Sequence, residues 1–151
     1  MPLLLLAVLM LVLAGSLGLR GTAHAQSVNA ATVTITISSP AKLIARTTLQ
    51  ISLTVSCTLP AGATLPSASA SVGVTQASGR VIVSAGGGSP ITCDGTAQTL
   101  QVFATPSVGS APFHGGSAIA TGGAIVEYLD ALGNFQEEGF STNPQVIKIS
   151  G

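Results

Sequence analysis

Beyond residue 30, hydrophobic and polar residues alternate along the chain with a period of two, which predicts β-strands that bury one face. The clearest run is 49–57, in which Leu49, Ile51 and Leu53 share one face and polar residues occupy the other. Seven segments follow this pattern: 32–37, 49–57, 68–75, 81–84, 98–105, 117–129 and 145–150. No amphipathic helix of useful length is predicted after residue 25.

Turn-forming residues separate these seven segments. Short strands at this spacing predict an all-β fold, a seven-stranded antiparallel sandwich of two sheets, with a small barrel as the alternative that periodicity cannot separate from it. Gly86-Gly87-Gly88 is interpreted as a flexible connector that ends the 81–84 strand, since it lacks the Lys-Ser/Thr pair of a phosphate loop. Gly122-Gly123 is interpreted as a β-bulge.

The first 25 residues differ from the rest because they are almost wholly apolar up to Leu19. Ala23-His24-Ala25 has the small-x-small pattern of a signal-peptidase site, so we expect a signal peptide at 1–25 and a mature, secreted domain at 26–151 that begins at Gln26. The competing interpretation is an uncleaved anchor that holds the domain on the outer side of a membrane.

Charge and cysteine content narrow the classes of function. Five basic and five acidic residues give a formal net charge of zero, which argues against nucleic acid as a partner. In an exported chain the two cysteines are most simply interpreted as a Cys57–Cys93 disulfide. Two buried free thiols are the alternative, and a zinc site is disfavoured because it would need further ligands.

Two short motifs carry a resemblance to a known group of domains. Cys93-Asp94-Gly95-Thr96-Ala97-Gln98-Thr99-Leu100 is a cysteine, a turn and a strand, and Asp130-Ala131-Leu132-Gly133-Asn134 is a D-x-x-G-N turn. Together with the strand count they resemble the immunoglobulin-like β-sandwich domains of small exported bacterial proteins, many of which have no assigned function. The resemblance implies an architecture. An antibody-type domain is excluded because there is no Trp and Ile91 stands two residues before Cys93.

Candidate catalytic residues are few. His114 is the one histidine of the mature chain, so a Ser-His-Asp hydrolase would have to be built around it, yet no G-x-S-x-G motif accompanies it. Glu137-Glu138 would act as an acid and base pair only if their environments separated their pKa values. We therefore expect a non-enzyme without a cofactor, and keep a hydrolase centred on His114 as the alternative.

Candidate binding residues lie in the predicted loops. Phe113, Phe135 and Phe140, with His114, would form a platform for a sugar or a protein if they were exposed together, although each also suits a core. Asp130 and its neighbours offer oxygen ligands for calcium, but a turn in which Asp bonds backbone amides explains them better, and no metal is expected. The sequence thus predicts an extracellular structural or binding module whose partner is a protein or carbohydrate.

Overall fold

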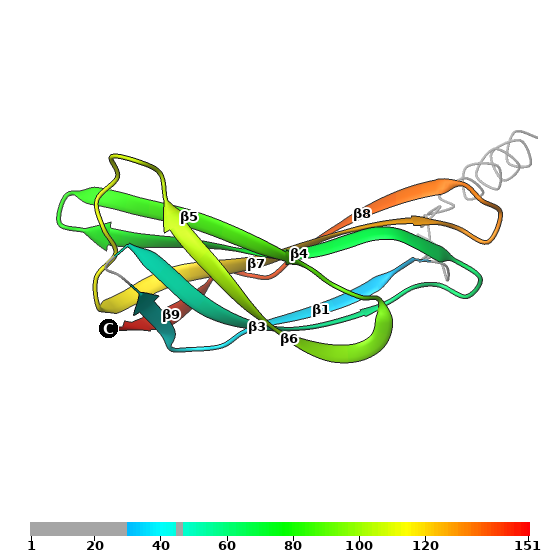
Figure 1. Cartoon of the computed structure of the whole chain (residues 1–151), viewed down its shortest axis with the longest axis horizontal. Coiled ribbons are helices and arrows are strands. Elements are labelled where there is room, and N and C mark those ends of the chain that lie inside the picture. Colours follow the sequence, from blue (N-terminus) through cyan, green and yellow to red (C-terminus); the bar gives the residue numbers. More distant parts are fainter. Residues whose placement is uncertain (1–29, 45–46) are drawn as a thin grey trace, which may run out of the picture.

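Nine β-strands form the part of the chain that the computed structural model describes, residues 30–44 and 47–151 (Figure 1). Those residues contain no apolar helix of the length needed to cross a bilayer. The predicted signal peptide at 1–25 and the start at Gln26 lie outside the described residues. The strands are β1 (Thr32–Ile37), β2 (Ala41–Ile44), β3 (Thr48–Thr58), β4 (Thr64–Ser78), β5 (Val81–Pro90), β6 (Asp94–Pro106), β7 (Gly116–Leu129), β8 (Phe135–Ser141) and β9 (Gln145–Ser150).

The sheet closes on itself. Seven strands follow one another around a barrel in the order β3-β2-β9-β7-β4-β5-β6, and β6 pairs with β3 to complete the ring. β1 is added alongside β3, and β8 alongside β7. β2 and β9 are parallel neighbours, whereas the other pairs are antiparallel. The all-β prediction is therefore confirmed, but the sheet is a closed, mixed barrel and is not clearly an antiparallel sandwich.

Two strands were missed, and β4, β5 and β6 were predicted too short. β2 has four residues, too few to show alternation, and β8 carries Glu137 and Glu138 on a strand with no fully buried side chain. β5 continues through Gly86-Gly87-Gly88 to Pro90 and pairs with β4 along its whole length, so the prediction of a flexible connector was wrong. Glycines have no side chains, so they show no alternation of apolar and polar residues. The backbone hydrogen bonds that pair two strands do not need side chains.

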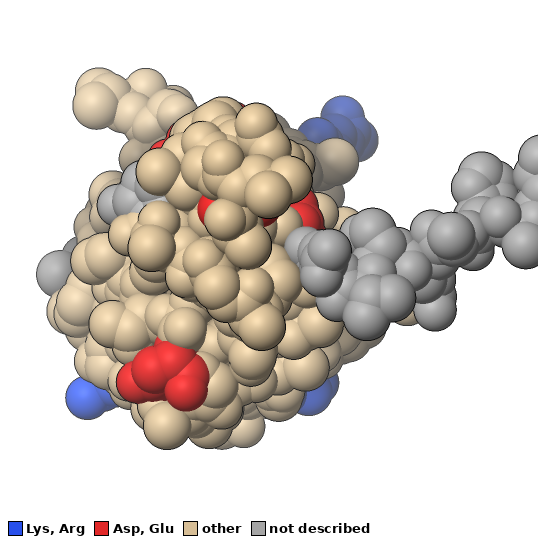
Figure 2. Space-filling view, turned by 90° about the vertical axis from the view of Figure 1, so that its right-hand side faces the viewer, with Lys and Arg blue, Asp and Glu red and all other residues tan. Residues whose placement is uncertain are grey.

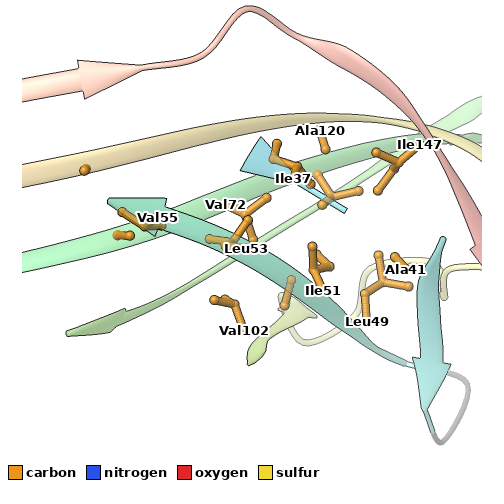
Figure 3. Close-up of a cluster of buried hydrophobic side chains, with 14 of the residues drawn as sticks. Ile37, Ala41, Leu49, Ile51, Leu53, Val55, Val72, Val102, Ala120 and Ile147 are labelled. Atoms are coloured by element: carbon orange, nitrogen blue, oxygen red, sulfur yellow. The ribbon is translucent and has the colours of Figure 1, made fainter. Parts of the chain in front are cut away.

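The barrel interior is filled by the inward-facing residues of the alternating strands (Figure 3). β3 contributes the most regular set, because every second residue from Leu49 to Cys57 is fully buried. The side chains of Val72, Val102 and Ile147 reach the same interior from β4, β6 and β9. The burial of these aliphatic side chains stabilises the barrel by about 1.5–3 kcal/mol each.

A disulfide joins Cys57 at the end of β3 to Cys93 just before β6, with 4.4 Å between the Cα atoms, and confirms the predicted pairing. Cys57 is fully buried and Cys93 packs against the core. In the chain-entropy model, closing a loop between two cysteines 36 positions apart stabilises the fold by roughly 4 kcal/mol. The bond indicates an oxidising, extracytoplasmic environment.

Glycines allow two close approaches inside the barrel. A Cβ atom on Gly87 would lie 2.3 Å from the carbonyl oxygen of Phe103, where β5 crosses β6. A Cβ atom on Gly122 would lie 2.9 Å from Cγ2 of Ile35, where β1 packs over β7. The predicted β-bulge at Gly122-Gly123 was wrong, since β7 keeps an unbroken register with β4 there. Gly87 and Gly122 each allow a neighbouring strand to approach more closely than a side chain would permit.

We expect the substitution Gly87→Ala to lower the free energy of unfolding by about 1–3 kcal/mol, because the added methyl group meets a backbone carbonyl that cannot turn aside. Gly73→Ala in β4 is the matched control, since nothing lies within 4 Å of its Cβ position, and we expect it to be neutral or to stabilise by about 0.5 kcal/mol. Urea denaturation of both variants measures the difference. Equal destabilisation would contradict a steric role for Gly87.

Candidate functional site

An apolar groove lies on the outer surface of the barrel, over β5, β4, β7 and β9. Its volume is about 300 Å³, and its lining includes Thr75, Ala77, Ile82, Ser117, Ile119 and Val146. The strand register explains how residues from four strands meet there. Ala77 pairs with Ile82 in one cross-strand row, and Thr75, Ile119 and Val146 pair in the next row, so side chains of two adjacent rows meet across the sheet.

The aliphatic side chains of these two rows are exposed to solvent. Ile119 is 50% exposed, Val146 71% and Ile82 73%. Isolated exposed aliphatic residues are ordinary on protein surfaces, but a contiguous row around a concavity is typical of a binding surface. Sequence analysis missed this groove. Alternation along β7 predicted only which of its residues face inward, whereas the groove depends on how four strands are aligned with one another.

The loop that carries His114 lies at one end of the groove and is held there by Gln76. The Gln76 side chain, 2% exposed, donates from Nε2 to the carbonyl oxygen of His114 at 2.8 Å and to that of Ser117 at 3.4 Å. Its Oε1 accepts from the backbone N–H of His114 at 3.0 Å. Gln76 therefore satisfies both backbone groups of His114 and fixes the loop against β4.

A sequence signal for Gln76 exists. The inward positions of β4 hold Ala70, Val72 and Val74, and the next inward position holds Gln76. A polar residue that interrupts an apolar face is buried only with hydrogen-bond partners, and backbone groups of a neighbouring loop are the commonest ones. The interruption predicts that the Gln76 side chain binds the backbone of a neighbouring loop, but it does not predict which loop.

The imidazole of His114 is surrounded by backbone carbonyls. Nδ1 lies 2.8 Å from the carbonyl oxygen of Gly115, and Nε2 lies 3.3 Å from that of Ala77. In the described part of the chain the hydrogen-bond partners of the ring include neither a carboxylate nor a serine hydroxyl. The geometry therefore gives no support to the hydrolase alternative, which needs both groups within reach of the ring.

The three phenylalanines considered for a binding platform are separated. Phe113 is 2% exposed and belongs to the core, and Phe140 is half-buried against the core. Phe135 is exposed at the start of β8, beside Leu129 at the far end of β7, whereas His114 precedes the first residue of that strand. The condition for a shared platform, common exposure, is not met.

The D-x-x-G-N turn joins β7 to β8 and is closed by Asp130. Oδ1 of Asp130 accepts from the backbone N–H groups of Leu132 and Asn134, each at 2.9 Å, and Oδ2 accepts from Nδ2 of Asn134 at 3.1 Å. These bonds, chiefly those from Asn134, hold the pKa of Asp130 below its ordinary value. The described residues contain no cluster of three or more potential metal ligands. The carboxylate serves the turn, as the sequence analysis preferred.

Tyr128, Glu138 and Ala31 form a small network near this turn. The Tyr128 hydroxyl donates to Oε1 of Glu138 at 2.5 Å, and the backbone N–H of Ala31 donates to the same oxygen at 3.3 Å. Glu138 therefore connects β7, β8 and the start of β1. The hydrogen bond to Glu138 raises the pKa of Tyr128, and burial of the phenol acts in the same direction.

The described charges are separated along the long axis of the molecule. Three basic residues lie at the end that holds the groove, which we call the basic end: Lys42, Arg80 and Lys148. All acidic residues lie toward the opposite end, which we call the acidic end: Asp94, Glu127, Asp130, Glu137 and Glu138. Figure 2 looks along the long axis onto the acidic end, where acidic atoms face the viewer and basic side chains appear only at the outline.

Comparisons with known proteins add no family. No protein-family model matches the chain, and no curated protein matches it. The fold and the surface define the protein as an all-β, disulfide-bonded barrel with an apolar groove at its basic end.

We expect Gln76→Ala to lower the free energy of unfolding by about 1–3 kcal/mol, because the N–H and C=O of His114 would lose their partners in a buried place. Gln98→Ala is the matched control. Gln98 holds the N–H and C=O of Thr92 in the same way, but at an exposed position where water can replace it. Chemical denaturation and hydrogen exchange at the His114 amide measure the effect; an equal loss in both variants would contradict a role for burial.

Tyr128 is the only tyrosine and the chain has no Trp, so phenolate absorbance reports this residue alone. We expect its titration midpoint above 10.0, and Glu138→Gln should lower it by removing the charged acceptor. The pKa of Tyr128 is raised in the folded state, so protonated Tyr128 contributes to the free energy of unfolding. This contribution is complete below pH 10.0 and is lost as the pH rises through the folded-state pKa. Glu137→Gln, with its side chain exposed beside the same network, should leave the midpoint unchanged. A midpoint insensitive to Glu138→Gln would disprove the assignment.

Proposed function

We propose that this protein is a non-catalytic, extracytoplasmic binding module that receives aliphatic side chains of a partner protein in the groove at its basic end. The observation that carries the proposal is the exposed group of Ile82, Ile119 and Val146 around a concavity of about 300 Å³. Leaving this apolar surface in water costs free energy that a partner recovers on binding, at roughly 25 cal/mol per Å² buried.

The chemistry of the groove favours a protein over a carbohydrate. Sugar rings stack on exposed aromatic side chains, and the groove lining contains none. Aliphatic walls with a polar rim suit the side chains of an apolar peptide segment. Lys148, whose Nζ donates to Oγ of Ser117 at 2.9 Å, adds a positive charge at the rim and favours a segment with acidic neighbours.

Export and family membership form part of the same proposal. A leader at 1–25 that is removed before Gln26 would deliver the domain to the oxidising compartment that the Cys57–Cys93 bond requires. The strand-rich architecture and the D-x-x-G-N turn between β7 and β8 support a relation to immunoglobulin-like modules of exported bacterial proteins.

The test uses capture of partners from the cell-surface and medium fractions by the exported protein. We expect Ile119→Asp to abolish capture, because a carboxylate would be buried in the groove. Ile125→Asp is the matched control, since Ile125 lies on the same face of β7 and is 52% exposed, against 50% for Ile119, but lies outside the groove. A partner captured equally by both variants would disprove binding in the groove.

A further inference from the structure

The β7–β8 hairpin at the acidic end projects apolar side chains. Leu132 at its tip is 87% exposed, and Phe135 beside it is 58% exposed. Glu127 and Glu137 pair with each other on the same face of the hairpin as Phe135, two residues further from the tip, and Asp130 begins the turn. The hairpin therefore presents exposed apolar side chains beside carboxylates.

The groove has the complementary properties at the opposite end. Its walls are the exposed Ile119 and Val146, and two cations adjoin it. Lys148 contacts Ser117 of the groove lining, and Arg80 lies in the turn between β4 and β5, two residues before Ile82. An acidic, apolar hairpin matches this basic, apolar concavity in both charge and polarity.

We propose that the occupant of the groove is the β7–β8 hairpin of a second copy of this chain, so that copies associate head to tail. This inference rests on the proposed function and names its partner. Leu132 and Phe135 enter the groove, and Glu137 and Asp130 lie near Lys148 and Arg80. The two surfaces lie at opposite ends of one molecule, so the contact is heterologous and each copy keeps a free hairpin and a free groove.

A heterologous contact of this kind grows into open chains. A hairpin tip in a groove buries less surface than the roughly 800 Å² per partner of a standard interface, so association is weak and depends on concentration. Its charges are exposed and are screened by salt over about 10 Å at 0.1 M, so association weakens as ionic strength rises.

The first experiment measures the weight-average mass of the exported protein by sedimentation over a range of concentrations at low and high ionic strength. We expect the mass to rise with concentration at low ionic strength and to fall on addition of salt. Ile119→Asp and Leu132→Asp should each weaken association about tenfold or more, because each places a charge in the apolar contact. Val108→Asp is the control, since Val108 is exposed and lies outside both the groove and the β7–β8 hairpin.

The second experiment mixes the Ile119→Asp and Leu132→Asp variants. The first retains an intact hairpin and the second an intact groove, so the mixture should form one-to-one dimers that do not grow, although each variant alone stays monomeric. In a symmetric contact through either surface alone, one of the two variants would still dimerise by itself. Combining Lys148→Glu with Glu137→Lys in one chain should restore association that either single reversal weakens.

The outcomes separate this inference from the proposed function. A protein that stays monomeric at all concentrations, while Ile119→Asp still loses capture of a cell-surface partner, overturns the contact between copies and leaves the groove as a site for another protein. Association that survives Leu132→Asp overturns the role of the hairpin. If the Ile119→Asp variant still associates and still captures a partner, both proposals are overturned.

Discussion

The close approach of β5 to β6 at Gly87 is the constraint on which the closed sheet depends. β5 and β6 pair through Ala85 and Gly86 only, so the ring is completed over a short seam where a side chain at Gly87 would meet the Phe103 carbonyl. On the other side of β6, pairing with β3 is long and keeps one register from Leu49 to Ser56. Closure places β4, β7 and β9 as successive strands of one curved surface, and the groove lies on that surface.

The fold was predicted from the sequence where side-chain alternation is strong. The run from Leu49 to Cys57 alternates without interruption because β3 has one face wholly inside the barrel, and prediction and structure agree there. Prediction was wrong at Gly86-Gly87-Gly88, where a strand without side chains has no periodicity. Closure itself was beyond the sequence, since an inward-facing residue alternates in the same way in a barrel and in a sandwich.

The candidate site was harder to predict than the fold. His114 lies close to the groove, but Phe113 is core and Phe135 lies at the other end, because loop position alone does not determine burial. The groove results from pairing between residues far apart in the sequence, such as Thr75 with Ile119, and no local pattern encodes that register. Among the residues that line the groove, Gln76 interrupts the apolar inward face of β4, and this local pattern marks its role.

The hydrogen bond from the backbone N–H of Ala31 to Glu138 fixes where the amino-terminal end of the described barrel lies. It holds the beginning of β1 beside β8 at the acidic end, so the polypeptide preceding Ala30 joins the barrel there. Val126 of β7 pairs with Glu138, and Ile119 of the same strand lines the groove, so seven residues at about 3.3 Å each separate the two points by on the order of 25 Å. A partner that holds the chain close to Ala31 would therefore leave the groove, at the other end of the barrel, uncovered.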